Sequence, residues 1–312
     1  MRSVLAWPLR ILMSGSTLGF RLTGICIIGA LLAPVLVLQA ENSSEGPEVV
    51  TRAKPPAPAH VVTSAALPAG KPNVAAAPDG AHPIDQALLL LGKSEERLAQ
   101  VADYETLFVM QERIGGTLRP PQYMQAKFRI EPFSIYLKWL DPDPGKEAIY
   151  VEGKNDNKIV THTTGIAKAL TGTLRIDPDS SLARKGYRHS LRDMGIVDLV
   201  TKLRHHWEFE RQFNVADVKV TQATLNDRDC YVVTVAHPIP NDGRFMFHTA
   251  KVYFDKQQML PIRIEGYEWP AQPGLTPGPL LESYTYLDLK VNNGLKDLDF
   301  SATNPEYSYS RF

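Results

Sequence analysis

The sequence has little cysteine and no net charge. The first feature bears on disulfide bonds, and the second bears on binding to nucleic acid. Only Cys26 and Cys230 occur in 312 residues, and Cys26 lies inside an uncharged apolar stretch. The chain beyond that stretch therefore lacks a pair for an internal disulfide, and we interpret Cys230 as a small apolar residue of a strand. The 34 basic and 34 acidic side chains cancel. No global field attracts nucleic acid, so we expect no nucleic-acid partner.

Sequence signatures of catalysis and of cofactor binding are also missing. The chain contains no GxSxG, HExxH, GxxxxGK[ST] or GxGxxG pattern, which removes the common nucleophile, zinc and phosphate motifs. His205 and Glu208 are three apart on a predicted helix, a spacing that can share a metal ion. No second cluster supplies obvious further ligands. We therefore expect no catalytic residue, no metal site and no cofactor, which describes a non-enzymatic protein.

An uncharged apolar run at residues 22 to 40 follows Arg2, Arg10 and Arg21, with no acidic residue before it. This layout is typical of a secretory signal. As a helix the run would also span about 28 Å, enough for an uncleaved membrane anchor. The sequence predicts residues 1–40 to be one or the other. In both cases the positive flank stays inside, which places the rest of the chain outside the cytoplasm, in the periplasm or cell envelope.

Residues 41–82 have a different composition from the rest of the chain. They include seven prolines and ten alanines but no Phe, Trp, Tyr or Ile. Such a segment cannot bury enough apolar surface to offset the entropy lost on ordering. We expect a disordered Pro/Ala-rich linker that leads to a folded domain at residues 83–312.

The domain begins with a helical pattern, since Ile84, Leu88, Leu91, Leu98 and Ala102 follow helical spacing. A second helical stripe lies within residues 190 to 213, where Ser190 and Asp193 resemble a capping box. Between and after the helices, apolar and polar residues alternate with a period of two, as in half-buried strands. Examples are "YETLFVMQER", "YMQAKFRI", "FSIYLKWL", "EAIYVEG", "KIVTHT", "DVKVTQATL", "CYVVTVAHP", "RFMFHTAKVYFD", "PIRIEGYEW", "LLESYTYLDLKV" and "LDF".

This order of elements predicts an α+β fold with an antiparallel sheet, because the connections are too short for parallel crossovers. About ten strands with two long helices leave more sheet than the helices can cover. We therefore expect a curved sheet that forms an open half-barrel around the helices and leaves an apolar groove. The residues that we expect to contact a ligand there are Ile135, Leu137, Trp139, Ile262 and Ile264.

A series of charged residues accompanies the first strands, and we interpret it as a solvated sheet face with pairing across strands. Its members are Glu112, Arg113, Lys127, Arg129, Lys138, Lys146 and Glu147.

The segment "MQAKFRIEPFSIYLKWLDPDPGKEAIYVEG" resembles the hallmark of the bacterial domain of unknown function 1571, with "RHSLRDMGI" and "VYFDKQQMLPIRIEGYEWP" similar to its later blocks. More distantly, "FDKQQMLPIRIEGY" followed by "ESYTYLDLKVNNGLKDLDF" resembles the outer-membrane lipoprotein carrier and sorting superfamily. That resemblance implies an unclosed half-barrel around helices whose cavity holds acyl chains.

Together these observations favour an extracytoplasmic, non-enzymatic protein that binds a lipid or a lipid-modified protein in an apolar groove. A sensor or protein-interaction module of the envelope, tethered to the membrane through residues 22–40, is the alternative. An envelope hydrolase is a third class, for which the sequence supplies no catalytic constellation.

Overall fold

The computed structural model describes residues 82–165, 171–237, 243–271 and 278–309. The expected signal or anchor, 1–40, lies outside these ranges, as does the expected linker, 41–82, apart from His82. Within the described ranges, no helix has the length and apolar character needed to cross a bilayer.

Twelve strands form one sheet in which neighbouring strands are antiparallel. They are β1 (Asp103–Ile114), β2 (Thr117–Leu118), β3 (Gln122–Arg129), β4 (Ser134–Asp141), β5 (Glu147–Val151), β6 (Ile159–His162), β7 (Leu174–Ile176), β8 (Asp217–Leu225), β9 (Arg228–Ala236), β10 (Thr249–Asp255), β11 (Pro261–Tyr267) and β12 (Leu280–Val291). The sheet order is β7-β6-β5-β4-β3-β1-β12-β11-β10-β9-β8, and β2 pairs with β1. The sheet is not closed, because β7 and β8 end this path on opposite edges.

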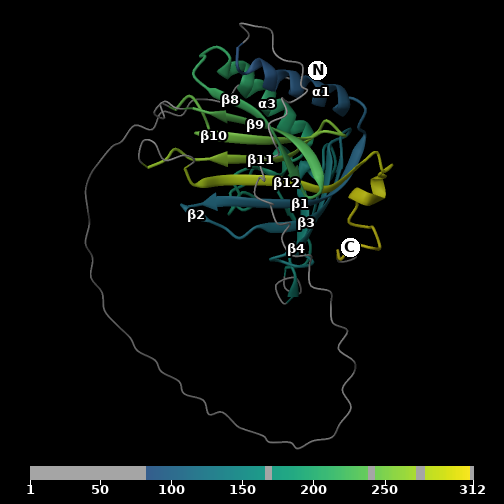
Figure 1. Ribbon diagram of the computed structural model, residues 1–312. Coiled ribbons are helices and arrows are strands. Elements are labelled where there is room, and N and C mark those ends of the chain that lie inside the picture. The colour runs from purple at the N-terminus through teal and green to yellow at the C-terminus, as the bar shows by residue number, and fades with distance from the viewer. Residues whose placement is uncertain (1–81, 166–170, 238–242, 272–277, 310–312) are drawn as a thin grey trace, which may run out of the picture. The chain divides into compact units, whose positions relative to one another are not determined.

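The first and last long strands lie side by side in the middle of the sheet (Figure 1). β1 pairs with β12 from Tyr104 with Val291 to Glu112 with Glu282. The strands that follow β1 build one half of the sheet, and the strands that precede β12 build the other. The chain between β7 and β8 must therefore travel from one edge to the other, and it carries the second helix on the way.

Two α-helices, α1 (Asp85–Leu98) and α3 (Ile196–Glu210), pack together over one side of the sheet, which we call the helix side (Figure 1). Their buried apolar residues recur at helical spacing and face the sheet. These residues are Ala87, Leu90 and Leu91 of α1 and Ile196, Val200, Leu203 and Trp207 of α3. The Arg204 guanidinium binds the Glu95 carboxylate at 2.5 Å, and the Ser94 hydroxyl donates to the Met259 carbonyl at 2.6 Å. These contacts fix α1 against both α3 and the sheet.

The start of α3 needs a glycine. Gly195 has a φ of 110°, which side-chain-bearing residues rarely adopt, and an added Cβ would lie 2.9 Å from the Tyr104 hydroxyl. That hydroxyl accepts a hydrogen bond of 2.8 Å from the Ile196 N–H. This N–H lies in the first turn of α3 and has no partner within the helix. The N-terminus of α3 is thus anchored to β1.

The main core lies between the helices and the sheet. Alternate residues of each strand point to the helix side, and the sheet contributes large side chains to it. Among them are Tyr104, Phe108, Met124, Phe128, Val252 and Phe254, together with Tyr286. Tyr104 stacks on Phe128 with ring centroids 4.6 Å apart. Burial of this apolar surface is the main force that holds the helices on the sheet.

The other side of the sheet carries residues 295–309, which we call the C-terminal segment. Its side chains Phe300 and Tyr309 form a second core with Tyr136, Ile149 and Val160 of β4, β5 and β6. The segment includes the 3₁₀ turn η3 (Asp297–Phe300). Two shorter 3₁₀ turns, η1 (Asn155–Asn157) and η2 (Leu191–Asp193), lie elsewhere in the chain.

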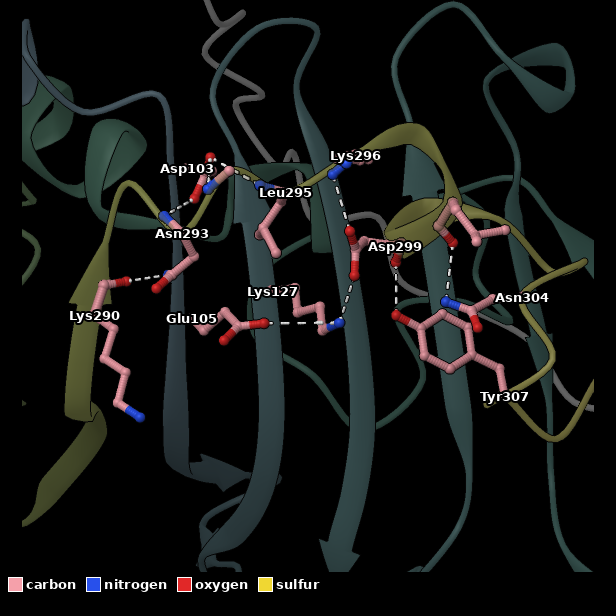
Figure 2. A network of polar contacts seen from close by, with 12 residues as sticks. Asp103, Glu105, Lys127, Lys290, Asn293, Leu295, Lys296, Asp299, Asn304 and Tyr307 are labelled. Carbon is pink, nitrogen blue, oxygen red and sulfur yellow. Dashed lines mark hydrogen bonds and ion pairs between the residues drawn. The ribbon is translucent and has the colours of Figure 1, made fainter.

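Polar contacts hold the C-terminal segment both at its start and further along the chain (Figure 2). At its start, Asp103 accepts the backbone N–H groups of Asn293 at 2.6 Å and Leu295 at 3.1 Å. Further along, the Lys127 ammonium binds Asp299 at 2.6 Å, and Asp299 also accepts the N–H of Lys296 at 2.9 Å. These bonds hold the chain that follows β12 against the side of the sheet opposite the helix side.

The structure confirms the expected fold class, an open antiparallel sheet wrapped around two helices. Two local predictions were wrong. Residues 298–300 belong to η3 rather than to a strand, because the chain there turns to cover the sheet. Ser190 does not cap the second helix, which begins at Ile196, and its hydroxyl instead donates to the Pro178 carbonyl at 3.1 Å.

The solvated-face interpretation of the charged series was wrong for two members. Glu112 is 4% exposed on the helix side, and Glu147 is 0% exposed beneath the C-terminal segment. A period of two assigns residues to a face but does not reveal what covers that face. Lys127 and Arg129 are partly covered as well, and they pair with Asp299 and Asp297.

Candidate ligand pocket

Four of the five residues expected to contact a ligand lie in the main core. Ile135, Leu137 and Trp139 alternate along β4, and Ile264 lies on β11, with three strands between them in the sheet order. Their exposed fractions are 0%, 1%, 4% and 8%. All four belong to the same buried cluster as side chains of α1 and α3, so protein atoms cover them.

Ile262 lies in a different environment from Ile264, although the two are only two residues apart. It belongs to a separate cluster with Leu225 and Cys230. The cause is an irregularity in the β10–β11 pairing, where Tyr253 opposes Arg263 but Phe254 opposes Pro261. One residue is thereby left without an opposite partner, and such a bulge re-aims the neighbouring side chain.

A pocket of about 490 Å³, partly open to solvent, adjoins Ile262, and we call it the cavity. It lies where β11 and β12 stop pairing, since their register begins at Arg263 with Thr285 and does not extend to Ile262. Beyond that point β12 continues with β1 alone, and its register also shifts between Glu105 and Leu107. The cavity thus results from two irregularities in neighbouring strand pairs.

The wall of the cavity is partly apolar and partly polar. Ile262 of β11, Leu225 at the end of β8, and Leu287 and Leu289 of β12 supply its aliphatic side chains. The polar lining consists of Asn226, Arg228, Asp255, Gln258, Asp288 and Lys290. A mixed wall of this kind is typical of sites that bind an apolar body and orient it through a few polar groups.

Two turns position the polar lining. The β8–β9 turn passes through Asn226 and Asp227, whose φ angles of 47° and 60° suit a two-residue hairpin. At the β10–β11 turn, one oxygen of Asp255 accepts the N–H groups of Gln257 and Gln258 at 2.8 and 2.7 Å. Both turns use the residue types that their backbone conformation requires.

An ion pair joins these two turns. The Arg228 guanidinium donates to the second oxygen of Asp255 at 2.6 Å, and this hydrogen bond raises the pKa of Arg228. Asp255 is 2% exposed, and both its oxygens are bonded. The nearby Cys230 thiol is 0% exposed, and burial raises its pKa to about 12. This thiol stays protonated at neutral pH and serves as an apolar packing group.

A second polar cluster, on the helix side, does not line this cavity. Glu112 and Glu282 oppose each other on β1 and β12. The Tyr284 hydroxyl donates to Glu112 at 2.5 Å, and the Arg188 side chain donates to Glu282 at 2.5 Å. His189 lies 3.0 Å from the same Glu282 oxygen. The cluster ties the segment before α3 to the middle of the sheet.

The surroundings of Glu112 and Glu282 shift the pKa values of the two carboxyl groups in opposite directions. Burial raises the pKa of Glu112. Burial also acts to raise that of Glu282, but hydrogen bonds and charge from His189 and Arg188 outweigh it and lower its pKa. A divergent carboxyl pair can do acid–base chemistry. Here the two Glu112 oxygens accept hydrogen bonds from the Tyr284 hydroxyl and the Arg188 N–H. The cluster therefore also has the features of a structural network in which the buried polar groups are paired.

Sequence reasoning missed Arg228, Asp255 and Gln258, which lie in or beside turns. The positions of Asn226 and Asp227 predict a turn, but no local signal places that turn beside the β10–β11 turn. Among the described residues, no three His, Cys, Asp or Glu side chains are placed to share a metal ion, and this includes His205 and Glu208.

Three solved structures illustrate what the chain is similar to. A DUF1329 family protein from Desulfovibrio piger is 13% identical, with 71% of this chain and 98% of that chain covered and a TM-score of 0.35. A putative outer membrane lipoprotein-sorting protein domain from Vibrio parahaemolyticus is 15% identical, with 68% and 95% covered and a TM-score of 0.30. The Mycobacterium tuberculosis lipoprotein LppX is 10% identical, with 65% and 93% covered and a TM-score of 0.36.

None of the curated proteins compared with the sequence matches it significantly. The family described as "Protein of unknown function (DUF1571)" matches residues 101–309, which is most of the chain and nearly all of its folded part. The match includes the segments that resemble this family by their residues. The chain therefore belongs to the DUF1571 family.

Proposed function

We propose that the chain is a non-enzymatic binding protein of the cell envelope that holds the apolar part of a lipid or a lipid-modified protein. The observation that carries this proposal is the cavity of about 490 Å³ between β11 and β12. Small-molecule sites in proteins measure about 300 to 1,000 Å³. The cavity is therefore large enough for a ligand rather than for a single water molecule.

The aliphatic wall favours an alkyl chain as the occupant. Leu225, Ile262, Leu287 and Leu289 present only hydrocarbon. Each methylene group transferred from water to such surroundings contributes about 0.8 kcal/mol to binding. Ile262, one of the five residues expected from the sequence, is the one that we place in contact with the ligand.

The other four expected residues contact a ligand only if the core that covers them opens. Ile135, Leu137, Trp139 and Ile264 are at most 8% exposed and belong to one buried cluster with side chains of α1 and α3. Within that cluster, α1 is held by its ion pair to Arg204 and its hydrogen bond to Met259. Ligand contact at these four positions remains a prediction. Contact there would indicate a groove that opens, whereas its absence would indicate a rigid cavity.

The cellular location belongs to the same proposal. The apolar run at 22–40 and its basic flank support export. A retained run would attach the protein to a membrane, where lipid ligands are present. The intact mass of the mature protein distinguishes a cleaved signal from an anchor.

The test is whether the purified chain binds lipid in this cavity. We expect mass spectrometry of an organic extract to detect co-purified lipid, and an apolar fluorescent dye to bind and be displaced by lipid. Leu289→Arg, which places a charge in the wall, should weaken dye binding about tenfold or more. Leu182→Arg is the matched control, because Leu182 is 63% exposed and outside the cavity. If neither lipid nor dye binds the native chain, the proposal is wrong.

A further inference from the structure

The cation Arg228 lines the cavity and keeps part of its hydrogen-bonding capacity free. Its side chain is 38% exposed, so solvent and small molecules reach it. Within the described residues, its Nε donates to Asp255 at 2.6 Å, and no group accepts a hydrogen bond from Nη1 or Nη2. The two terminal nitrogens of this guanidinium are therefore free donors at the wall of the cavity.

The ion pair with Asp255 holds this guanidinium in place. Asp255 is fixed in turn, because its other oxygen accepts the N–H groups of Gln257 and Gln258 at 2.8 and 2.7 Å. An arginine that is already held loses little further freedom when it binds a ligand. Its two terminal nitrogens match the oxygens of a carboxylate or a phosphate. The arrangement therefore favours an oxyanion as the group that Arg228 binds.

Lys290 adds a second positive charge to the lining. It is an exposed residue of β12, and its backbone carbonyl accepts a hydrogen bond from the Asn293 amide. Its ammonium makes no contact with the residues drawn in Figure 2 and has no ion pair within the described residues. Two strands separate β12 from β9 in the sheet order, so Lys290 acts on a ligand beside Arg228 through its electric field.

The carboxylates of the lining offer a ligand less than the cations do. Two of them, Asp255 and Asp288, belong to the described lining. Asp255 is 2% exposed and both of its oxygens are bonded, so it has no free acceptor for a ligand. Asp288 is exposed. The lining thus offers a ligand two accessible cations and one accessible carboxylate.

We infer that the cavity selects an amphiphile with an oxyanion head, whose oxygens accept hydrogen bonds from Nη1 and Nη2 of Arg228 while its alkyl chain contacts Ile262 and Leu289. Long-chain fatty acids and alkyl phosphates belong to this class, and alcohols with the same chain do not. Hydrogen bonds between ionised partners are roughly twice as strong as neutral ones, so the charge of the head decides the affinity. The inference rests on the proposed function and adds the chemistry of the head group to it.

Probes that share one alkyl chain and differ in the head test the inference. In the native full-length chain at pH 8, displacement of the apolar dye should give dodecanoate or dodecyl phosphate an affinity at least about tenfold higher than that of 1-dodecanol. Comparison of the two oxyanions distinguishes a carboxylate head from a phosphate head. Dodecyltrimethylammonium, whose head is a cation, should bind no more tightly than the alcohol.

Two variants identify the groups that recognise the head. Arg228→Lys keeps a cation beside Asp255 but removes the pair of terminal nitrogens, so the preference for an oxyanion over 1-dodecanol should fall about fivefold or more. Lys290→Gln should lower the same preference about twofold, because one charge is lost from the lining. Lys185→Gln is the matched control, since Lys185 is exposed and outside the cavity, and it should leave the preference unchanged. The preference is a ratio within each variant, so a modest loss of stability does not obscure it.

The outcomes separate this inference from the proposed function. If 1-dodecanol binds the native chain as tightly as both oxyanions, the inference is overturned while lipid binding stands. Tightest binding of dodecyltrimethylammonium also overturns it, because Asp288 then sets the charge of the head. So does an oxyanion preference that Arg228→Lys leaves unchanged or, if that variant does not fold, one that Lys290→Gln leaves unchanged. If none of the probes displaces the dye, or the dye itself does not bind, the proposed function fails first.

Discussion

At the scale of single residues, the most consequential groups are carboxylates that the sheet buries. Glu112 and Glu282 occupy opposite positions on β1 and β12, an arrangement that destabilises an antiparallel pair when both residues are charged. The protein compensates with Arg188 and His189, which bond to Glu282, and with the raised pKa of Glu112. Glu112 thus binds a proton more readily in the folded state than in the unfolded chain.

The first prediction concerns this proton. A raised carboxyl pKa means that the folded state is favoured while Glu112 is protonated and loses stability as pH rises through its folded pKa. We expect Glu112→Gln, which mimics the protonated form, to raise the melting temperature at pH 8 by about 2–4 °C, as about 1 kcal/mol does in a domain of this size. At pH 5 the change should be smaller. Thermal unfolding at both pH values checks this, and an equal shift at both would refute it.

Residue patterns predicted the period of each strand but not the surroundings of its side chains. Glu112 and Glu147 look like surface residues because each stands beside another charged residue, Arg113 or Lys146. Their burial results from chain segments about 80 to 170 positions away in sequence, namely Arg188, Glu282 and Ser308. No local pattern contains that information.

At the scale of elements, the C-terminal segment depends on one buried carboxylate. Glu147 accepts hydrogen bonds from the Ser308 N–H at 2.8 Å and the Tyr136 hydroxyl at 3.0 Å, and it lies 2.9 Å from His162. Burial alone would raise the pKa of Glu147, but the hydrogen bonds from His162, Ser308 and Tyr136 lower it. The ionised form of Glu147 therefore holds the segment on the sheet.

The second prediction follows from the sign of that shift. Stability from a lowered carboxyl pKa is present above the unfolded value, about 4.3, and is lost as pH falls through the folded value. We expect the protection factor of the Ser308 amide, its intrinsic exchange rate divided by the observed rate, to fall in acid, and Glu147→Gln to lower it already at pH 7. Asp297→Asn is the control, because the Asp297 side chain is 70% exposed and its ion pairs contribute little. Equal exchange in both variants would show that Glu147 does not hold the segment.

The third prediction tests how firmly α1 is packed. Leu91 is 0% exposed in the main core and Leu89 is 47% exposed on the same helix. We expect Leu91→Ala to lower the free energy of unfolding by about 2–5 kcal/mol, and Leu89→Ala to change it by less than about 0.5 kcal/mol. Denaturant titration of both variants measures the difference. Similar values would mean that α1 is not part of the cooperative core.

Elements were the scale at which the sequence was most informative. The hairpin of β10 and β11, which begins at Thr249 and ends at Tyr267, follows from alternation and the turn between the strands. The short edge strand β7 was not predicted, because three residues carry too little periodic signal. The adjacency of β1 and β12 depends on contacts between distant segments, which strand patterns do not specify.

At the scale of the whole described domain, the cavity proposed to hold the ligand lies in an unexpected place. We expected an apolar groove on the helix side, where the helices would not cover the sheet. The described core residues on that side form one buried cluster with side chains of α1 and α3. The cavity lies instead where β11 and β12 separate, a position set by register irregularities that a strand pattern does not reveal.

The central claim is that a lipid enters this cavity, and methyl NMR of the full chain during titration with 1-dodecanol tests it most directly. The account predicts that methyl signals of Leu225, Ile262 and Leu289 shift, while those of Ile135 and Leu137 in the main core do not. The opposite pattern, in which Ile135 and Leu137 respond and Ile262 does not, would contradict the cavity assignment and place the ligand in the main core beside β4. A titration without any shift would contradict lipid binding itself.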